Sequence, residues 1–200
     1  MKRIFPLLIF TMLGIAHGAS QGPNSAGTGA NDATAGTTVW VLPGNITSSD
    51  DTDATVVLGP AGDTQYLAGS NFSFSIPTNS TIDGIIVYFE RSGEGASGAC
   101  EDVAVRLIKA GTIQSTDKSG VGSWGTSQST VTYGGASDLW SGTWTPSDIN
   151  NSSFGAAIRG VNNGSGVTCH ADWMGIEVYY TTFSLETKIF GGTIHGGTIK

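Results

Sequence analysis

The chain has little charge and only two cysteines. Of its 200 residues, 12% are charged, with 9 basic against 16 acidic side chains and a formal net charge of −7. An acidic surface repels phosphate backbones, so the composition disfavours nucleic-acid binding. The low charge also leaves few groups for acid–base chemistry. The sequence contains no Gly-x-Ser-x-Gly elbow, His-Glu-x-x-His motif or phosphate-binding loop, so no catalytic motif points to an enzyme.

Long apolar runs are absent outside the first residues. Residues 4–15 are apolar, follow a basic start, and are too few to span a bilayer as a helix. Ala16 and Gly18 supply small residues at the positions that signal peptidase prefers. We therefore expect residues 1–18 to be a secretory signal that is cleaved after Gly18. A retained membrane anchor is the alternative, whereas a cleaved chain would have no contact with a membrane.

The remaining sequence divides into three parts. Residues 19–37 are rich in Gly, Ala, Ser, Thr and Asn, which predicts a flexible leader. Residues 38–182 hold the apolar residues of one domain. Residues 183–200 form a tail in which Gly-Gly-Thr-Ile occurs twice. Such a repeat cannot bury itself, so the tail is either a disordered end or an exposed strand that pairs with another chain.

Helical periodicity is also scarce, and alternation with period two takes its place. It is clearest in residues 85–91, 103–108 and 174–180. Further strand-like segments are residues 38–42, 54–58, 65–67, 71–76, 113–116, 129–133 and 154–159. Turns rich in Gly, Pro and Asn separate them, and the long strands are polar on one face. The pattern predicts an all-β fold: a two-sheet antiparallel β-sandwich that is jelly-roll-like.

Alternation also predicts which side chains face the core. In the central strands we expect the inward set to be Ile85, Val87, Phe89, Val103, Val105 and Leu107, and in the segment 71–76 we expect Phe72, Phe74 and Ile76. One helical turn is expected at residues 145–150, where Thr145 can cap and Pro146 suits the first helical position.

Cys100 and Cys169 each stand just before one of the alternating segments. Export favours oxidation, so we expect a disulfide between them, with two separate buried thiols as the alternative. The expected location is secreted or extracellular, at a cell surface or in a periplasm.

Several motifs between residues 72 and 180 resemble one group of proteins. They are Phe-Ser-Ile-Pro at 74–77, Ile-Asp-Gly-Ile at 82–85, Thr-Val-Thr-Tyr-Gly-Gly at 130–135, Leu-Trp at 139–140, Trp-Thr-Pro-Ser-Asp-Ile-Asn at 144–150 and Phe-Gly at 154–155. The stretch resembles β-sandwich domains of bacterial secreted proteins and phage structural proteins. The resemblance implies a non-catalytic sandwich and carries over no ligand.

Aromatic residues cluster in a glycine-rich segment. Trp124, Tyr133, Trp140 and Trp144 lie close together in sequence, with Asp138 among them. Exposed rings could stack on sugar faces, and Asp138 could accept hydrogen bonds from sugar hydroxyls. The alternative is that the rings close one end of the sandwich, because tryptophans are well buried on average.

Acidic residues suggest two further sites. Asp50, Asp51 and Asp53 could offer oxygen ligands to Ca²⁺, although their spacing is not that of an EF-hand and a solvated acidic turn explains them as well. In an unbroken alternation, His170 and Asp172 lie on the same face of the strand, so the geometry allows a catalytic His–Asp pair.

Carboxylates could also serve as a glycosidase pair, for which the candidates are Glu90, Glu94, Glu101 and Asp102. We expect no enzyme. The expected function is that of a secreted non-catalytic structural or adhesive module, self-associating through its tail. A carbohydrate-binding module with a glycan partner and a hydrolase are the alternatives.

Overall fold

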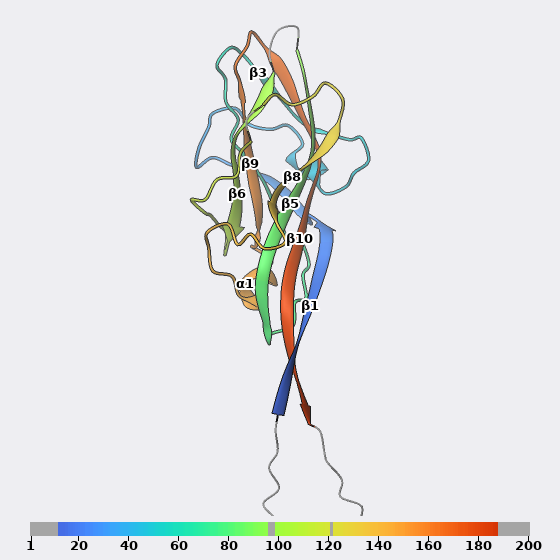
Figure 1. Ribbon diagram of the computed structural model, residues 1–200. Coiled ribbons are helices and arrows are strands. Elements are labelled where there is room, and N and C mark those ends of the chain that lie inside the picture. Colours follow the sequence, from blue (N-terminus) through green and yellow to red (C-terminus); the bar gives the residue numbers. More distant parts are fainter. Residues whose placement is uncertain (1–11, 96–98, 121, 188–200) are drawn as a thin grey trace, which may run out of the picture.

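The computed structural model describes residues 12–95, 99–120 and 122–187. They form an elongated sandwich of two antiparallel sheets (Figure 1). The strands are β1 (Met12–Ser25), β2 (Thr28–Asp32), β3 (Ala54–Leu58), β4 (Tyr66–Ser70), β5 (Ser80–Glu94), β6 (Cys100–Lys109), β7 (Thr112–Ile113), β8 (Ser129–Gly135), β9 (Gly155–Asn162) and β10 (Val167–Thr187). Two single turns accompany them, the 3-10 helix η1 (Pro43–Ile46) and the α-helix α1 (Pro146–Ile149).

The two sheets have the connectivity of a jelly roll. The first sheet has the order β10-β5-β8, with β1 and β3 both pairing with β10, and the second has the order β2-β4-β9-β6-β7. From β3 to β10 the chain alternates between the sheets, except at the short β6–β7 hairpin. This arrangement of eight strands is the one found in jelly rolls. The predicted two-sheet β-sandwich is therefore confirmed.

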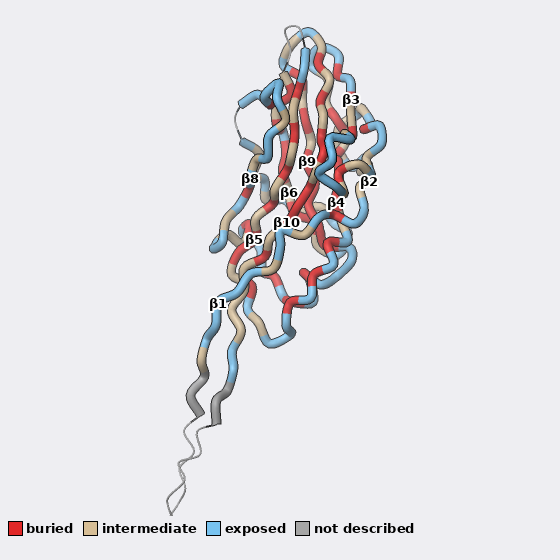
Figure 2. Tube along the Cα trace, turned by 90° about the vertical axis from the view of Figure 1, so that its right-hand side faces the viewer, coloured by how far each residue is buried: buried red, intermediate tan, exposed pale blue. Residues whose placement is uncertain are grey.

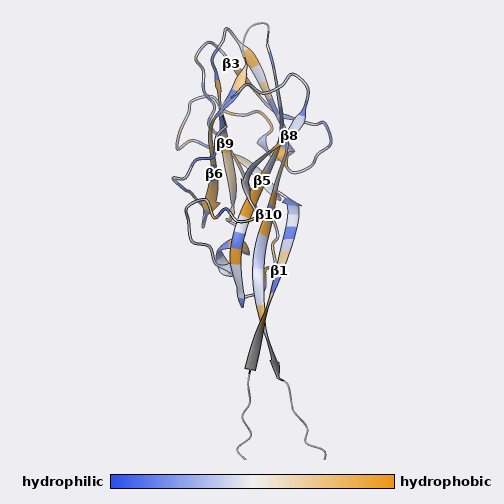
Figure 3. Ribbon diagram, in the orientation of Figure 1, coloured by the Kyte–Doolittle hydropathy of each residue, from blue (hydrophilic) through white to orange (hydrophobic). Residues whose placement is uncertain are grey.

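The core lies between the sheets, where Figure 2 shows the buried residues. On β5, Ile85, Val87 and Phe89 are at most 1% exposed, as the alternation predicts. Their partners on the neighbouring strand β10, such as Ile176 and Val178, are fully buried. Hydrophobic and hydrophilic bands alternate along β5 in Figure 3, which is the pattern expected of a strand with one face in the core.

The segment 71–76 buries the expected side chains without forming a strand. Phe72, Phe74 and Ile76 are 2%, 7% and 2% exposed. Asn71 and Ser73 have φ angles of 60° and 55°, in the left-handed region, so the backbone cannot join a regular ladder. The backbone N–H and C=O of Ile76 bind the side chain of Asn150 instead, at 2.7 and 2.8 Å.

One prediction of an inward side chain fails at a β-bulge. The register of β6 against β9 shifts between Asp102 and Ala104, so Val103 does not continue the alternation. Val103 is 36% exposed, whereas Asp102 is 9% exposed and points inward. Val105 and Leu107 are buried as expected. The bulge therefore places a carboxylate in the core where the pattern predicts a valine.

The N-terminal residues 19–37 are not a flexible leader, so that prediction is wrong. Residues 19–25 lie in β1, which pairs with β10, and β2 pairs with β4. Small polar residues can form these strands because the hydrogen bonds between strands come from the backbone, and the edges of the two sheets offer backbone partners. Asn31 fastens the following loop, since its side chain bonds the backbone N–H and C=O of Trp40 at 2.8 and 2.9 Å. The domain thus begins before residue 38.

The two ends of the chain meet in one ribbon. β1 and β10 cross and project together below the body of the sandwich (Figure 1). Residues 183–187 of the predicted tail continue β10. Residues 188–200 and 1–11 lie outside the described residues, and cleavage after Gly18 stays a prediction. Within the described part of the chain, no helix is long and apolar enough to cross a membrane.

The predicted helical turn is confirmed as α1. The Thr145 hydroxyl accepts a hydrogen bond from the backbone N–H of Asp148 at 3.1 Å, and the Asp148 carboxylate accepts one from the backbone N–H of Thr145 at 2.9 Å. These reciprocal bonds form a capping box, and Pro146 occupies the start of the turn.

Candidate functional site

The predicted sugar-binding rings are part of the core. Trp124, Tyr133 and Trp140 are 3%, 6% and 3% exposed, and Trp144 is 9% exposed. The Trp140 indole donates to the backbone oxygen of Ile85 at 3.0 Å. A ring that is covered on both faces cannot stack on a sugar. The prediction of a stacking platform formed by these rings is therefore wrong, and the alternative of rings that close the sandwich holds.

Asp138 also differs from its predicted role. Its carboxylate accepts the backbone N–H of Trp140 at 2.8 Å and forms an ion pair with Lys118 at 2.7 Å. These partners hold the pKa of Asp138 below its usual value, against the effect of burial. Asp138 therefore fixes the turn that leads into Trp140.

A buried polar cluster replaces the predicted platform. The Asp102 carboxylate accepts hydrogen bonds from the Trp124 indole at 2.7 Å, the Tyr133 hydroxyl at 2.6 Å and the Arg91 guanidinium at 3.2 Å. The guanidinium also lies 4.8 Å from the centre of the Trp124 ring. Burial, and then the charge of Asp102, raises the pKa of Tyr133, so the phenol stays a donor. We call Arg91, Asp102, Trp124 and Tyr133 the Asp102 cluster.

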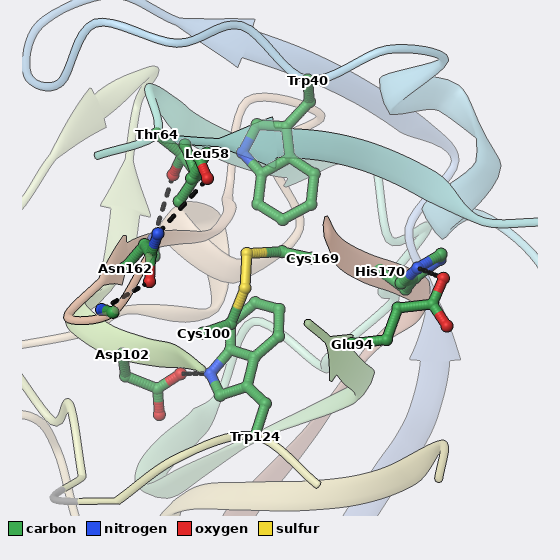
Figure 4. The surroundings of a disulfide bond; sticks show 12 residues. Trp40, Leu58, Thr64, Glu94, Cys100, Asp102, Trp124, Asn162, Cys169 and His170 are labelled. Atoms are coloured by element: carbon green, nitrogen blue, oxygen red, sulfur yellow. Dashed lines mark hydrogen bonds and ion pairs between the residues drawn. A yellow bond between two sulfur atoms is a disulfide. The ribbon is translucent and has the colours of Figure 1, made fainter. Parts of the chain in front are cut away.

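The disulfide lies beside this cluster and links the two sheets. Cys100 begins β6 of the second sheet, and Cys169 lies in β10 of the first. Both cysteines are fully buried, and Trp40 and Trp124 lie on either side of the bond with ring centroids 6.4 Å apart (Figure 4). The predicted disulfide is confirmed. A structural disulfide indicates a non-cytoplasmic environment.

The acidic loop at residues 50–53 does not gather its carboxylates around one point. Asp50 accepts the backbone N–H of Thr52 at 3.1 Å. Asp53 contacts Gln128 at 3.1 Å and His170 at 2.9 Å. Within residues 12–95, 99–120 and 122–187, no group of three or more His, Cys, Asp or Glu side chains could hold a metal ion. A Ca²⁺ site at Asp50, Asp51 and Asp53 stays a prediction without geometric support.

His170 and Asp172 do not form the pair that alternation permits. The register of β10 against β5 shifts between Ala171 and Trp173, and Asp172 is 1% exposed where it packs against the loop at residues 50–52. His170 instead contacts Asp53 and Glu94, the latter at 3.3 Å. A bulge thus separates the two groups, and the His–Asp pair that alternation left possible is not formed.

The remaining glycosidase candidates each have their own partner. Glu90 accepts a hydrogen bond from the Ser49 hydroxyl at 2.7 Å. Glu101 accepts from Ser123 at 3.2 Å, while Glu94 and Asp102 belong to the contacts given above. Each of these carboxylates therefore has a hydrogen-bond partner of its own, which explains its position without a catalytic role.

Asp172 is buried with one oxygen unpartnered. Its Oδ1 atom accepts the backbone N–H groups of Thr52 at 3.1 Å and Asp50 at 3.5 Å, whereas Oδ2 has no partner. Burial raises the pKa of Asp172, and the negative charges of Glu90 and Asp53 raise it further, although hydrogen bonds from the backbone of the acidic loop act in the opposite direction. Ionised Asp172 therefore opposes folding.

We expect Asp172→Asn to stabilise the protein at neutral pH, by about 1 kcal/mol. Because the folded-state pKa is raised, the contribution of Asp172 to stability is complete below its unfolded pKa and declines as pH rises through the folded value. The gain from Asn should therefore grow from about pH 3 to pH 7 and vanish at the acidic end. Denaturant unfolding across this range measures it, with the exposed Asp50→Asn as control. A gain that does not change with pH would contradict this account of Asp172.

Trp173 is the aromatic residue that sequence reasoning missed. It is partly exposed on the outer face of the first sheet, and its indole donates to the Ser25 hydroxyl at 2.8 Å. An unbroken alternation would turn Trp173 toward the core with Ala171, and the bulge at Asp172 turns it outward. The one sequence feature that indicates this bulge is the spacing of Ala171 and Met174, which are both buried although they are three positions apart.

The projecting ribbon is the second exposed feature. β5 pairs with β10 only as far as Thr182, opposite Ser80. Beyond this point, residues 183–187 pair with β1 alone, through residues 12–16. Phe183 is 53% exposed there. The end of β10 therefore depends on a single neighbouring strand.

Comparison of the chain with protein-family models, with curated protein sequences and with solved structures finds no match. The functional argument therefore rests on the geometry of the fold.

Proposed function

We propose that this chain is an exported, non-catalytic structural or adhesive module that assembles through the end of β10. The observation that carries the proposal is the pairing of residues 183–187, whose only neighbour among the described strands is the stretch 12–16 of β1. These partner residues fall within the predicted signal segment. Cleavage after Gly18 would remove them.

Such cleavage would leave one long, open strand edge. Residues 181–187 pair with residues 12–18 in the uncleaved chain, so all of them would lose their β1 partner. Residues 19–25 would remain paired and would keep the rest of the sheet edge covered. An unpaired edge offers backbone N–H and C=O groups to another strand. The edge at residues 181–187 is therefore an acceptor for a strand from another copy.

The rest of the molecule fits a structural role. The disulfide and the Asp102 cluster hold the two sheets together from within, and neither presents a reactive group to solvent. The candidate carboxylates are engaged with separate partners. Rigid sandwiches of this kind display surfaces and edges, and a projecting strand at one end suits end-to-end assembly.

Removing the end of β10 is expected to abolish self-association. Two chains that both begin at Ala19 are compared by light scattering over a range of concentrations, one ending at Lys200 and one at Thr182. We expect the longer chain to exceed the monomer mass as concentration rises, and the shorter one to remain a monomer. Core packing should survive, because Val178 is the last fully buried residue among those of β10 whose burial the structure describes.

Two further variants of the longer chain separate strand pairing from other effects of the tail. Phe183→Pro with Ser184→Pro removes two adjacent backbone donors, one toward each edge, and should also give a monomer. Val57→Thr changes an apolar residue that is 72% exposed on β3, at the other end of the molecule, and should leave association unchanged. Equal masses for the long and short chains at every concentration would overturn the proposal.

A further inference from the structure

The outer face of the first sheet carries a stripe of aromatic and polar side chains. Trp173, Gly175, Glu177 and Tyr179 alternate along β10 with Met174, Ile176 and Val178, which are at most 1% exposed. The first set therefore points away from the core. Tyr88 of β5 lies directly opposite Gly175 and joins the set. We call Trp173, Tyr88, Glu177 and Tyr179 the outer stripe.

The Trp173 ring lies flat against the sheet. A Cβ atom added at Gly175 would lie 2.4 Å from both Cη2 and Cζ2 of Trp173 and 3.2 Å from Cε2, so the six-membered ring covers the glycine. The indole N–H is held by the Ser25 hydroxyl on β1 at 2.8 Å. One face of the ring is thus against backbone and its edge is fixed, while the residue as a whole is partly exposed.

Tyr88 and Glu177 extend this surface. The Tyr88 ring is centred 6.2 Å from the Trp173 ring at an angle of 35°, and its hydroxyl donates to Oε2 of Glu177 at 2.8 Å. Burial, followed by the effect of Glu177, raises the pKa of Tyr88 to about 12. The phenol is therefore protonated at neutral pH and holds the carboxylate in place.

The stripe ends in an open cleft. The cleft has a volume of about 800 Å³ and is lined by Tyr179 and Tyr180, with Ser20, Thr81 and Asp83 among its polar groups. This volume is within the range of small-molecule sites. From Trp173 to Tyr179 the strand runs about 20 Å, at the usual rise per residue. The surface is thus long and narrow, with ring faces at one end and hydroxyl and carboxylate groups at the other.

We propose that the outer stripe and the adjoining cleft bind a neutral oligosaccharide. A flat, fixed aromatic ring offers an apolar face to the C–H side of a sugar, and the carboxylates of Glu177 and Asp83 accept hydrogen bonds from its hydroxyls. Acidic glycans are excluded by these carboxylates and by the net charge of −7. This binding function does not rest on strand-mediated assembly, which uses the end of β10.

A protein partner fits this face less well. The large apolar side chains that are most exposed lie elsewhere among the described residues. They are Val39, Val41, Leu42, Val57, Val103 and Phe183. The buried centre of a protein interface is depleted of charged residues, whereas the outer stripe places the carboxylate of Glu177 between Trp173 and Tyr179 along β10.

The fluorescence of the protein can report this site directly. The other four tryptophans are buried (Trp40, Trp124, Trp140 and Trp144). Binding over Trp173 should therefore change the emission of that residue and protect it from quenching by acrylamide. The full chain is first applied to a broad array of neutral glycans, and the best neutral oligosaccharide on it is then titrated in solution.

Three variants test the assignment of the site. Trp173→Ala should weaken binding about 10- to 100-fold, as expected for truncation of a central aromatic contact. Gly175→Ala should also weaken it, because the added methyl group displaces the ring, and this variant keeps the test valid if Trp173→Ala folds poorly. Phe183→Ala removes an exposed aromatic ring outside the stripe and should leave affinity unchanged.

The proposal is overturned if none of the neutral glycans on the array binds the protein. It is also overturned if both stripe variants bind as tightly as the original chain, or if acidic glycans bind more tightly than neutral ones. Affinity that is unchanged by Phe183→Ala but lost in both stripe variants supports it.

Discussion

Replacing Asp102 by alanine is expected to lower the free energy of unfolding by about 3–5 kcal/mol. Asp102 is the common acceptor for Trp124, Tyr133 and Arg91, and its carboxylate balances the charge of a guanidinium that is itself buried. Alanine would leave this positive charge uncompensated in the core, together with two unpaired donors. Removing one partner of a buried ion pair is far more destabilising than removing an exposed one.

Unfolding in guanidinium chloride, followed by tryptophan emission, measures the loss of unfolding free energy. Arg106→Ala is the matched control, because Arg106 lies on the same strand and pairs with Asp117 at an exposed site, where an ion pair contributes at most about 1 kcal/mol. Asp102→Asn keeps the shape and removes the charge, so it should fall between the two. A loss for Asp102→Ala no larger than that for Arg106→Ala would show that the Asp102 cluster does not support the core.

Removing the disulfide is expected to have an effect of similar size. The bond closes a loop with a sequence separation of 69, for which the chain-entropy model gives about 4 kcal/mol. Cys100→Ala with Cys169→Ala also removes two buried sulfur atoms between Trp40 and Trp124, which adds a packing loss. We expect a large fall in the unfolding midpoint and reduced yield of folded protein from an oxidising compartment.

The single variants provide the comparison for this experiment. Each leaves one buried thiol, so their stability should resemble that of the double variant if the covalent link is the source of the effect. Thiol titration of the denatured original protein should find no free sulfhydryl. A double variant as stable as the original chain would contradict the view that the bond between the sheets is a main stabilising element.

Much of the fold could be predicted from the sequence because most strands are amphipathic. Ile85, Val87 and Phe89 lie on one face of an unbroken ladder, so period two identifies their burial correctly. The ends of the chain could not be predicted in the same way. Residues 19–32 are small and polar, and their pairing depends on backbone groups of β10 and β4 that no local pattern reveals.

The candidate sites were harder to predict because they depend on bulges. One bulge turns Asp102 inward and Val103 outward, and another buries Asp172 under the loop at residues 50–52 and turns Trp173 outward. Each reverses the faces that alternation assigns, because an inserted residue shifts the register by one. The clustering of Trp124 and Trp140 left a stacking platform open as one reading, whereas the partly exposed tryptophan is Trp173, whose orientation depends on a bulge.

Hydrogen–deuterium exchange of residues 181–187 tests most directly whether the end of β10 accepts another strand. The chain that begins at Ala19 is labelled at a series of concentrations, and exchange is followed by mass spectrometry. We predict that these amides exchange rapidly in dilute solution and become protected as concentration rises, while those around Ile176 stay protected throughout. Exchange at residues 181–187 that is the same at every concentration, whether fast or slow, would contradict the proposed assembly.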